Sequence, residues 1–324
     1  MMALVAALAS AACRGDAGGA AGASAQPAAP STGTSSLSLA PAGASAAGAT
    51  SAGGPQVKID PVTMKLYRAD LCLFASLGLR HLREAYLGSL RGGEPGPGRI
   101  PSFDKAPNVD HERQARTCAQ AAVTREPAIA SIDAPMASFG PLMAHLAEEI
   151  EEGSEYYVLK QHERDAFAKG KATHKKLVAL FAKLDEGQSA LAAGIDAYRA
   201  AHPTNLATLD EGERVTTLVL DAGRALVLAL VGNAPEKVLA ALLGATEIAS
   251  TRAAERAKEH PDDPWSRAAV GVGAFRQAAT SATAKGAGAD ARLTATTSFA
   301  RLVEVAHLAR ASALLEREKA KPGP

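Results

Sequence analysis

Apolar side chains recur every three or four residues from Lys58 onward, and no stretch alternates apolar and polar residues as a half-buried strand does. This spacing predicts helices. The first is expected to have Asp60 as its N-cap and Pro61 as its first residue, and to run to about Leu90. The others are expected as a short helix around Cys118, a helix from Ala134-Pro135 past Tyr157, and helices over 165–200, 207–231, 235–260, 265–284 and 289–319.

Short segments rich in Pro, Gly, Asn and Asp lie between the later helices, namely "HPTN", "GNAP", "HPDDP" and "KGAGAD". Short turns between long helices favour antiparallel neighbours. We therefore expect an all-α fold, an antiparallel bundle of long helices over residues 58–320. No repeat of fixed period indicates a solenoid.

The stretch "DAFAKGKATH" at 165–174 contains the residue types of a phosphate or metal site. It also begins an unbroken series of steps of three and four residues that continues to Tyr198, which is the pattern of a helix packed along one face. The series places Gly170 and His174 on the packed face. Asp165 is expected to cap the helix.

A phosphate loop needs an upstream glycine and a preceding strand, and "AKGKAT" has neither. We interpret Gly170 as a point of close helix approach and His174 as a buried, hydrogen-bonded residue. A ligand contact formed by His174, Tyr157 and Lys171 is the alternative. The flanking lysines are expected to point to solvent; they are Lys169, Lys171, Lys175 and Lys176.

The first 57 residues have the composition of a leader and a tether. "MMALVAALASAAC" is an apolar run ending in small residues, so residues 1–13 are expected to be a lipoprotein signal peptide and lipobox with lipidation at Cys13. Residues 14–57 are rich in Ala, Gly, Ser and Pro and are expected to form a disordered tether. These features predict a cell-envelope protein that is lipid-anchored, at the periplasmic face of the outer membrane.

The charge balance argues against a nucleic-acid partner, because Lys+Arg 35 against Asp+Glu 34 leaves no basic excess and no basic cluster. The expected partners are the membrane, through the N-terminal lipid, and another envelope protein or a small ligand. Aromatic residues make up only 4% of the chain, so the core must consist mainly of Ala, Leu and Val. The most apolar helix carries Asp221 and Arg224 at its middle, which indicates a bundle helix and not a membrane span.

Two cysteines remain once Cys13 is assigned to the lipid. In an oxidising compartment, Cys72 and Cys118 form one pair, and a disulfide between them would close a loop of about 45 residues. Such a loop stabilises the fold by about 4 kcal/mol in the chain-entropy model. The alternative is two buried free thiols.

Several histidines lie three residues from an acid, as in the pairs His81/Glu84 and His145/Glu148. His81/Glu84 resembles the His-x-x-Glu motif of the imelysin-like proteins, so the alternative function is an envelope metal-binding protein, with His81, Glu84, His145 and Glu148 as the candidate ligands. A ferritin-like dimetal site needs two Glu-x-x-His helices, and only Glu304/His307 has that order, so no metal or other cofactor is expected. The lowest-ranked alternative is a hydrolytic enzyme, because no local nucleophile motif such as G-x-S-x-G is present.

The segment "EEGSEYYVLKQHERDAFAKGKATHKKL" carries a Tyr-Tyr pair followed by Asp-x-Phe-Ala-Lys-Gly-Lys-x-x-His. It resembles a segment of the YiiG-like family of bacterial lipoproteins of unknown function. "KLYRADLCLF" and "SFARLVEVAH" are similar to the first helix and the C-terminal pattern of that family, although Phe74 and Ala300 replace asparagines. The resemblance implies an envelope location and a helical fold, and no catalytic residues. Our hypothesis is a lipid-anchored binding or scaffolding module that is not an enzyme.

Overall fold

The structure, a computed structural model, describes residues 59–103 and 110–320. It divides the chain into two units, Met1–Gln56 and Val57–Pro324, and the expected leader, tether and Cys13 lie outside the described residues. The described residues form eight α-helices and no strand, which confirms the all-α prediction. They are α2 (Pro61–Ser89), α3 (His111–Val123), α4 (Ala130–Val158), α5 (Ala168–Ala201), α6 (Glu211–Val231), α7 (Glu236–Glu259), α8 (Ser266–Thr283) and α9 (Ala289–Lys319).

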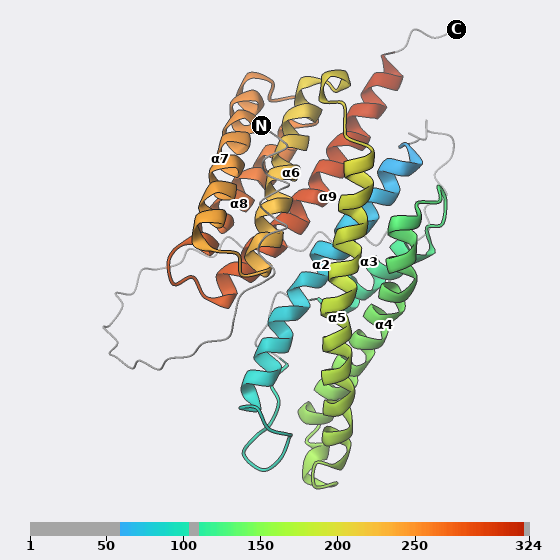
Figure 1. Ribbon diagram of the computed structural model, residues 1–324, viewed down its shortest axis with the longest axis vertical. Coiled ribbons are helices and arrows are strands. Elements are labelled where there is room, and N and C mark those ends of the chain that lie inside the picture. The colour runs from blue at the N-terminus through green and yellow to red at the C-terminus, as the bar shows by residue number, and fades with distance from the viewer. Residues whose placement is uncertain (1–58, 104–109, 321–324) are drawn as a thin grey trace. The chain divides into compact units, whose positions relative to one another are not determined.

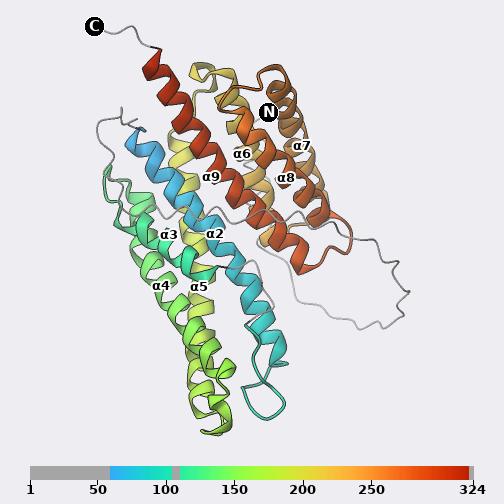
Figure 2. The same ribbon diagram turned by 180° about the vertical axis from the view of Figure 1, so that it is seen from behind.

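The helices pack in two groups of four (Figures 1 and 2). In the first bundle, α2 to α5, helix α4 packs against α3 and α5, while α2 packs against α3 and α5. In the second bundle, α6 to α9, successive helices pack against each other and α9 returns to α6. Helix α2 also packs along α9, so the two bundles share a seam.

Helices α2, α7, α8 and α9 lie within a residue or two of their predicted bounds, whereas the starts of α4, α5 and α6 were predicted wrongly. Helix α4 begins at Ala130 and not at Ala134, because Asp133 Oδ2 accepts a hydrogen bond of 2.7 Å from Ile129 N–H and completes an earlier first turn. Helix α6 begins at Glu211 and not at 207. Asp210 caps it by accepting from Glu213 N–H at 2.7 Å.

The core of the first bundle is tied by a covalent bond. A disulfide joins Cys72 of α2 to Cys118 of α3, with the sulfur atoms 2.00 Å apart and both residues fully buried. Both cysteines belong to a buried apolar cluster that also contains Phe74, Phe139 and Leu146. The short helix α3 is therefore held against α2 and α4.

An ionic network with a buried centre, Asp70 and Arg224, joins α2, α5 and α6. Asp70 accepts from Arg224 at 2.5 Å and from Arg199 at 2.6 Å. Arg224 also donates to Asp196 at 2.8 Å, and Arg199 donates to Asp221 at 3.1 Å. Both arginines thus bridge acids on different helices, which fixes how the two bundles are aligned at this level.

Candidate binding site at the aromatic end

Aromatic side chains gather at one end of the first bundle, where α2 and α4 end and α5 begins; this is the lower end in Figures 1 and 2. Six of the chain's twelve tyrosines and phenylalanines lie here, with neighbouring ring centroids about 5–6 Å apart. We call this cluster the aromatic end. Its members are Tyr86, Phe103, Tyr156, Tyr157, Phe167 and Phe181, together with His162 and His174.

The "DAFAKGKATH" stretch forms the start of α5, but the helix begins at Ala168 and not at 165. Ala166 and Phe167 have positive φ angles of 50° and 66°, so the chain turns sharply before the helix. This turn lets Asp165 Oδ2 accept from Lys169 N–H at 3.0 Å, while Oδ1 accepts from the Tyr156 hydroxyl at 2.6 Å. Asp165 therefore caps α5, as predicted, although it lies three residues before the first residue of the helix. These hydrogen bonds lower its pKa.

The Asp165 carboxylate occupies the place that a phosphate would take at the first turn of α5, so the arrangement does not offer a phosphate loop. The lysines that suggested one are exposed, as predicted. Lys169 lies 3.9 Å from Glu152, and Lys176 donates to Glu149 at 2.6 Å. Lys171, one of the predicted ligand contacts, is exposed and forms no ion pair with a described residue.

Gly170 is a point of close helix approach, as predicted. A Cβ atom at this position would lie 2.2 Å from Tyr157 Oη, so only glycine allows the Tyr157 ring to lie across α5. The two tyrosines at the end of α4 differ in burial. Tyr156 is the buried one, at 2% exposure, because its hydroxyl reaches Asp165, and Tyr157 is half-buried.

His174 contacts a residue that is 88 positions away in the sequence. Its Nδ1 lies 3.1 Å from Tyr86 Oη, and the two rings stack with centroids 5.8 Å apart. Burial lowers the pKa of His174, which favours a neutral ring. The expected hydrogen-bonded histidine is therefore present, although it is half-buried and not fully enclosed.

Two polar side-chain atoms of the aromatic end are buried and form no hydrogen bond with a described residue. They are Tyr157 Oη and His162 Nδ1, and the two ring centroids lie 5.3 Å apart. Burial also raises the pKa of Tyr157, which keeps its proton on the oxygen as a donor. His162 was not among the predicted site residues. The only sequence signal was its place between the Tyr-Tyr pair and Phe167.

The four residues of the metal alternative do not form a site, so this prediction was wrong. His81 and Glu84 lie on α2, where His81 Nε2 is 3.2 Å from Asp290 and Glu84 is exposed. His145 and Glu148 lie on α4, and both are exposed. Throughout the described ranges, no three His, Cys, Asp or Glu side chains lie close enough together to hold a metal ion. A spacing of three residues brings a histidine and an acid onto one helix face, but it does not bring the two helices' pairs together.

The Glu304/His307 pair of α9 contacts side chains of the first bundle. Glu304 forms an ion pair with Arg113 of α3. His307 stacks on Tyr67 of α2, with ring centroids 3.7 Å apart. Both side chains therefore serve the contact between α9 and the first bundle.

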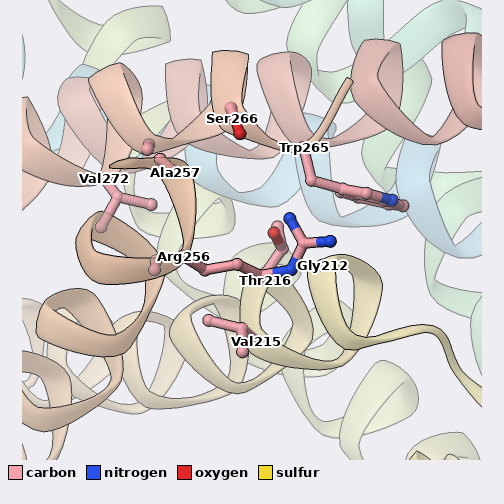
Figure 3. A pocket seen from close by; sticks show the side chains of 10 residues that line it. Gly212, Val215, Thr216, Arg256, Ala257, Trp265, Ser266 and Val272 are labelled. Carbon is pink, nitrogen blue, oxygen red and sulfur yellow. The ribbon is translucent and has the colours of Figure 1, made fainter. Parts of the chain in front are cut away.

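A pocket in the second bundle, between α6, α7 and α8, has room for about one water molecule (Figure 3). The Arg256 side chain lies between Thr216 and Trp265, and its guanidinium pairs with Asp263 at 2.5 Å. Trp265 is 6% exposed and packs on Gly212, so it belongs to the core. The pocket is too small for an organic ligand.

Residues 72–216 match the model of one protein family, which is described as a protein of unknown function (DUF3829). The match runs from Cys72 in α2 to Thr216 in α6, so it includes the aromatic end and leaves out most of the second bundle. No curated protein and no solved structure matches the chain. Among the described residues, no helix has the length and apolarity needed to span a bilayer.

Proposed function

We propose that this protein is a lipid-anchored helical module of the cell envelope that binds a partner through its aromatic end and catalyses no reaction. The leader, Cys13 and the tether composition support the location, and so does the resemblance to the YiiG-like lipoproteins. A Cys72–Cys118 disulfide is also suited to an oxidising compartment. The family match supports looking for the function in the first bundle.

The observation that carries the proposal is the pair of buried, unpartnered atoms in the aromatic end. Buried polar groups in folded proteins nearly always have a hydrogen-bond partner, and each exception calls for an explanation. Tyr157 Oη and His162 Nδ1 are two of twelve such side-chain atoms among the described residues, and they belong to neighbouring rings whose centroids lie 5.3 Å apart. A bound partner that supplies an acceptor to Tyr157 would remove the cost of leaving its hydroxyl unpaired.

In vivo photo-crosslinking tests this binding site. A photoreactive amino acid replaces Lys171, beside the aromatic end, or Lys183, which is equally exposed on the same helix but more than three turns away. We expect a discrete adduct from position 171, its loss when Tyr157→Phe is added, and none from position 183. Equal adducts from both positions, or an adduct that Tyr157→Phe leaves unchanged, would remove the aromatic end from the proposal.

The location is tested separately by metabolic labelling with palmitate. We expect the wild-type chain to incorporate the label and to sediment with the membrane fraction, because the lipid is attached at Cys13. The Cys13→Ser variant should remain unlabelled. A wild-type chain that takes up no label would show that the anchor is absent.

A further inference from the structure

The turn between α4 and α5, residues 159–167, lies at the lower end of the first bundle in Figures 1 and 2. Five residues other than glycine have a positive φ in the described parts of the chain. Three of them lie in this turn, namely Lys160 at 53°, Ala166 at 50° and Phe167 at 66°. Such residues rarely adopt this left-handed conformation, because their Cβ lies too close to the following carbonyl oxygen. The turn therefore stores backbone strain, which other contacts must offset.

The packing inside the turn adds a second unfavourable contribution. His162 is 6% exposed, and its ring lies among those of Tyr156, Tyr157 and Phe167, with centroids 5.1–6.2 Å away. Its Nδ1 nevertheless has no hydrogen-bond partner among the described residues, and neither has Tyr157 Oη on the neighbouring ring. Burying a polar atom without a partner is unfavourable, so strain and unpaired groups both oppose the closed turn.

An aspartate bridges the two sides of the turn. Asp165 Oδ1 accepts from the Tyr156 hydroxyl at 2.6 Å, and Oδ2 accepts from Lys169 N–H at 3.0 Å, so the carboxylate joins the end of α4 to the start of α5. Because the acceptor is charged, these are strong hydrogen bonds. The short helix within the turn, Gln161–Glu163, packs on α4 and α5, the two helices that the turn connects. The turn can therefore open while the four helices stay packed.

We propose that residues 159–167 form a lid over the aromatic end, with the hydrogen bond between Tyr156 and Asp165 as its latch. Opening moves the His162 ring away from Tyr157 and relieves the strain in the turn. It also exposes Tyr157 Oη, so that a partner can supply the missing acceptor. This inference rests on the proposed function, because it describes how access to the same site is controlled.

The balance between the closed and the open lid decides how the site responds to a partner. A partner that binds only the open form shifts the population toward that form. The strain and the unpaired atoms of the closed turn reduce the binding energy that opening requires. A turn that stays rigid, with its strain merely tolerated, is the competing outcome.

Acylation of histidines by diethyl pyrocarbonate, followed by mass spectrometry of peptides, measures how often the lid opens in the purified full-length chain. His162 is buried while the lid is closed, whereas His145 is exposed and supplies the reference rate in each sample. We expect Tyr156→Phe, which removes the latch, to raise the rate at His162 by at least about fivefold. The matched control is Tyr86→Phe. Tyr86 is equally buried and its hydroxyl also contacts one side chain, His174, but it lies outside the lid, so His162 should stay protected.

A second substitution acts in the opposite direction. Ala166 is exposed, so Ala166→Asn changes no packed surface, and asparagine adopts a positive φ more readily than alanine does. We expect it to stabilise the closed lid and to slow the acylation of His162 by about threefold.

Hydrogen exchange separates opening of the lid from general unfolding. In Tyr156→Phe, the amides of residues 159–167 should exchange faster, while those in the middle of α4 and α5 keep their wild-type rates. Faster exchange throughout both helices would overturn the lid, because Tyr156 would then support the fold as a whole. The lid is also overturned if Tyr156→Phe and Tyr86→Phe affect His162 equally, or if Ala166→Asn does not slow its acylation.

Crosslinking from position 171 tests whether the lid controls the binding site. Tyr156→Phe should increase the yield of the adduct that depends on Tyr157. An adduct that still requires Tyr157 but does not change with Tyr156→Phe would overturn this control and leave the proposed function intact. If His162 responds as expected but position 171 gives no adduct, the lid stands and the proposed function falls.

Discussion

The two bundles are built from the same kind of helix but hold themselves together differently. The first bundle has a disulfide, two buried tyrosines and a cluster of contacting rings and histidines. In the second, alanine is the most frequent buried apolar residue, as at Ala279 and Ala295, with valines, leucines and a few large rings. Two of its buried threonines, Thr246 and Thr296, donate to the carbonyl one turn earlier in their own helix.

This difference separates a specialised part from a supporting one. Small side chains allow helices to approach closely, but they bring few polar atoms that could recognise a partner. The family match ends five residues after the second bundle begins, so the part that resembles other proteins is the one with the aromatic end. The second bundle supports it through the α2–α9 seam and the Asp70 network.

The largest expected effect comes from removing the covalent tie of the first bundle. The double change Cys72→Ala and Cys118→Ala removes a cross-link between residues 46 positions apart in the sequence. Because the unfolded chain is then less constrained, we expect the free energy of unfolding to fall by about 4 kcal/mol. Chemical denaturation followed by circular dichroism measures it. Wild-type protein unfolded and refolded under reducing conditions is the control and should match the variant.

The same variant tests whether the bundles unfold together. Hydrogen exchange should increase first in α3, the short helix that the disulfide holds, and least in α7 and α8. Equal acceleration in both bundles would show that they form a single cooperative unit, and the proposed division into a specialised and a supporting part would lose its energetic basis.

Three glycine-to-alanine changes compare how tightly each bundle is packed. At Gly194 a Cβ would lie 1.9 Å from the backbone oxygen of Ser131, which cannot move aside, so we expect a loss of about 3 kcal/mol. At Gly223 the nearest atoms belong to two phenylalanine rings that can shift, and about 1 kcal/mol is expected. Gly244 has open space around it, so alanine should stabilise α7 by about 0.5–1 kcal/mol.

Thermal or denaturant unfolding of the three variants gives this order directly. A larger loss at Gly223 than at Gly194 would mean that the second bundle is the more rigid one. Destabilisation at Gly244 would indicate that its surface is covered by something outside the described residues.

The sequence was sufficient for the helical fold because periodicity and helix caps are local signals. Asp60-Pro61 marked the start of α2 to the residue, since an N-cap and a first-turn proline act within one turn. The start of α5 was missed by three residues because two non-glycine residues adopt positive φ, which no local propensity predicts. The partner of His174 could not be found either. It depends on how α2 and α5 pack, and that is fixed by contacts far apart in the chain.

An effect smaller than that at Gly194 is expected at the seam between the bundles, where His307 of α9 stacks on Tyr67 of α2. Burial, with the nearby positive charges of Arg310 and Arg68, lowers the pKa of His307 from 6.5 to about 4. The folded state therefore binds this proton less readily than the unfolded state. The stabilisation from a neutral ring is complete above pH 6.5 and is lost as the pH falls toward 4.

Because the ring is only half-buried, we expect this group to account for about 1–2 kcal/mol of the acid destabilisation, after allowance for solvent screening. His307→Phe keeps a ring for Tyr67 to stack on but has no proton to bind. Its free energy of unfolding should therefore fall less than that of the wild type between about pH 7 and about pH 4.5. An identical fall in both proteins would mean that the His307 ring does not contribute to the acid sensitivity of the molecule.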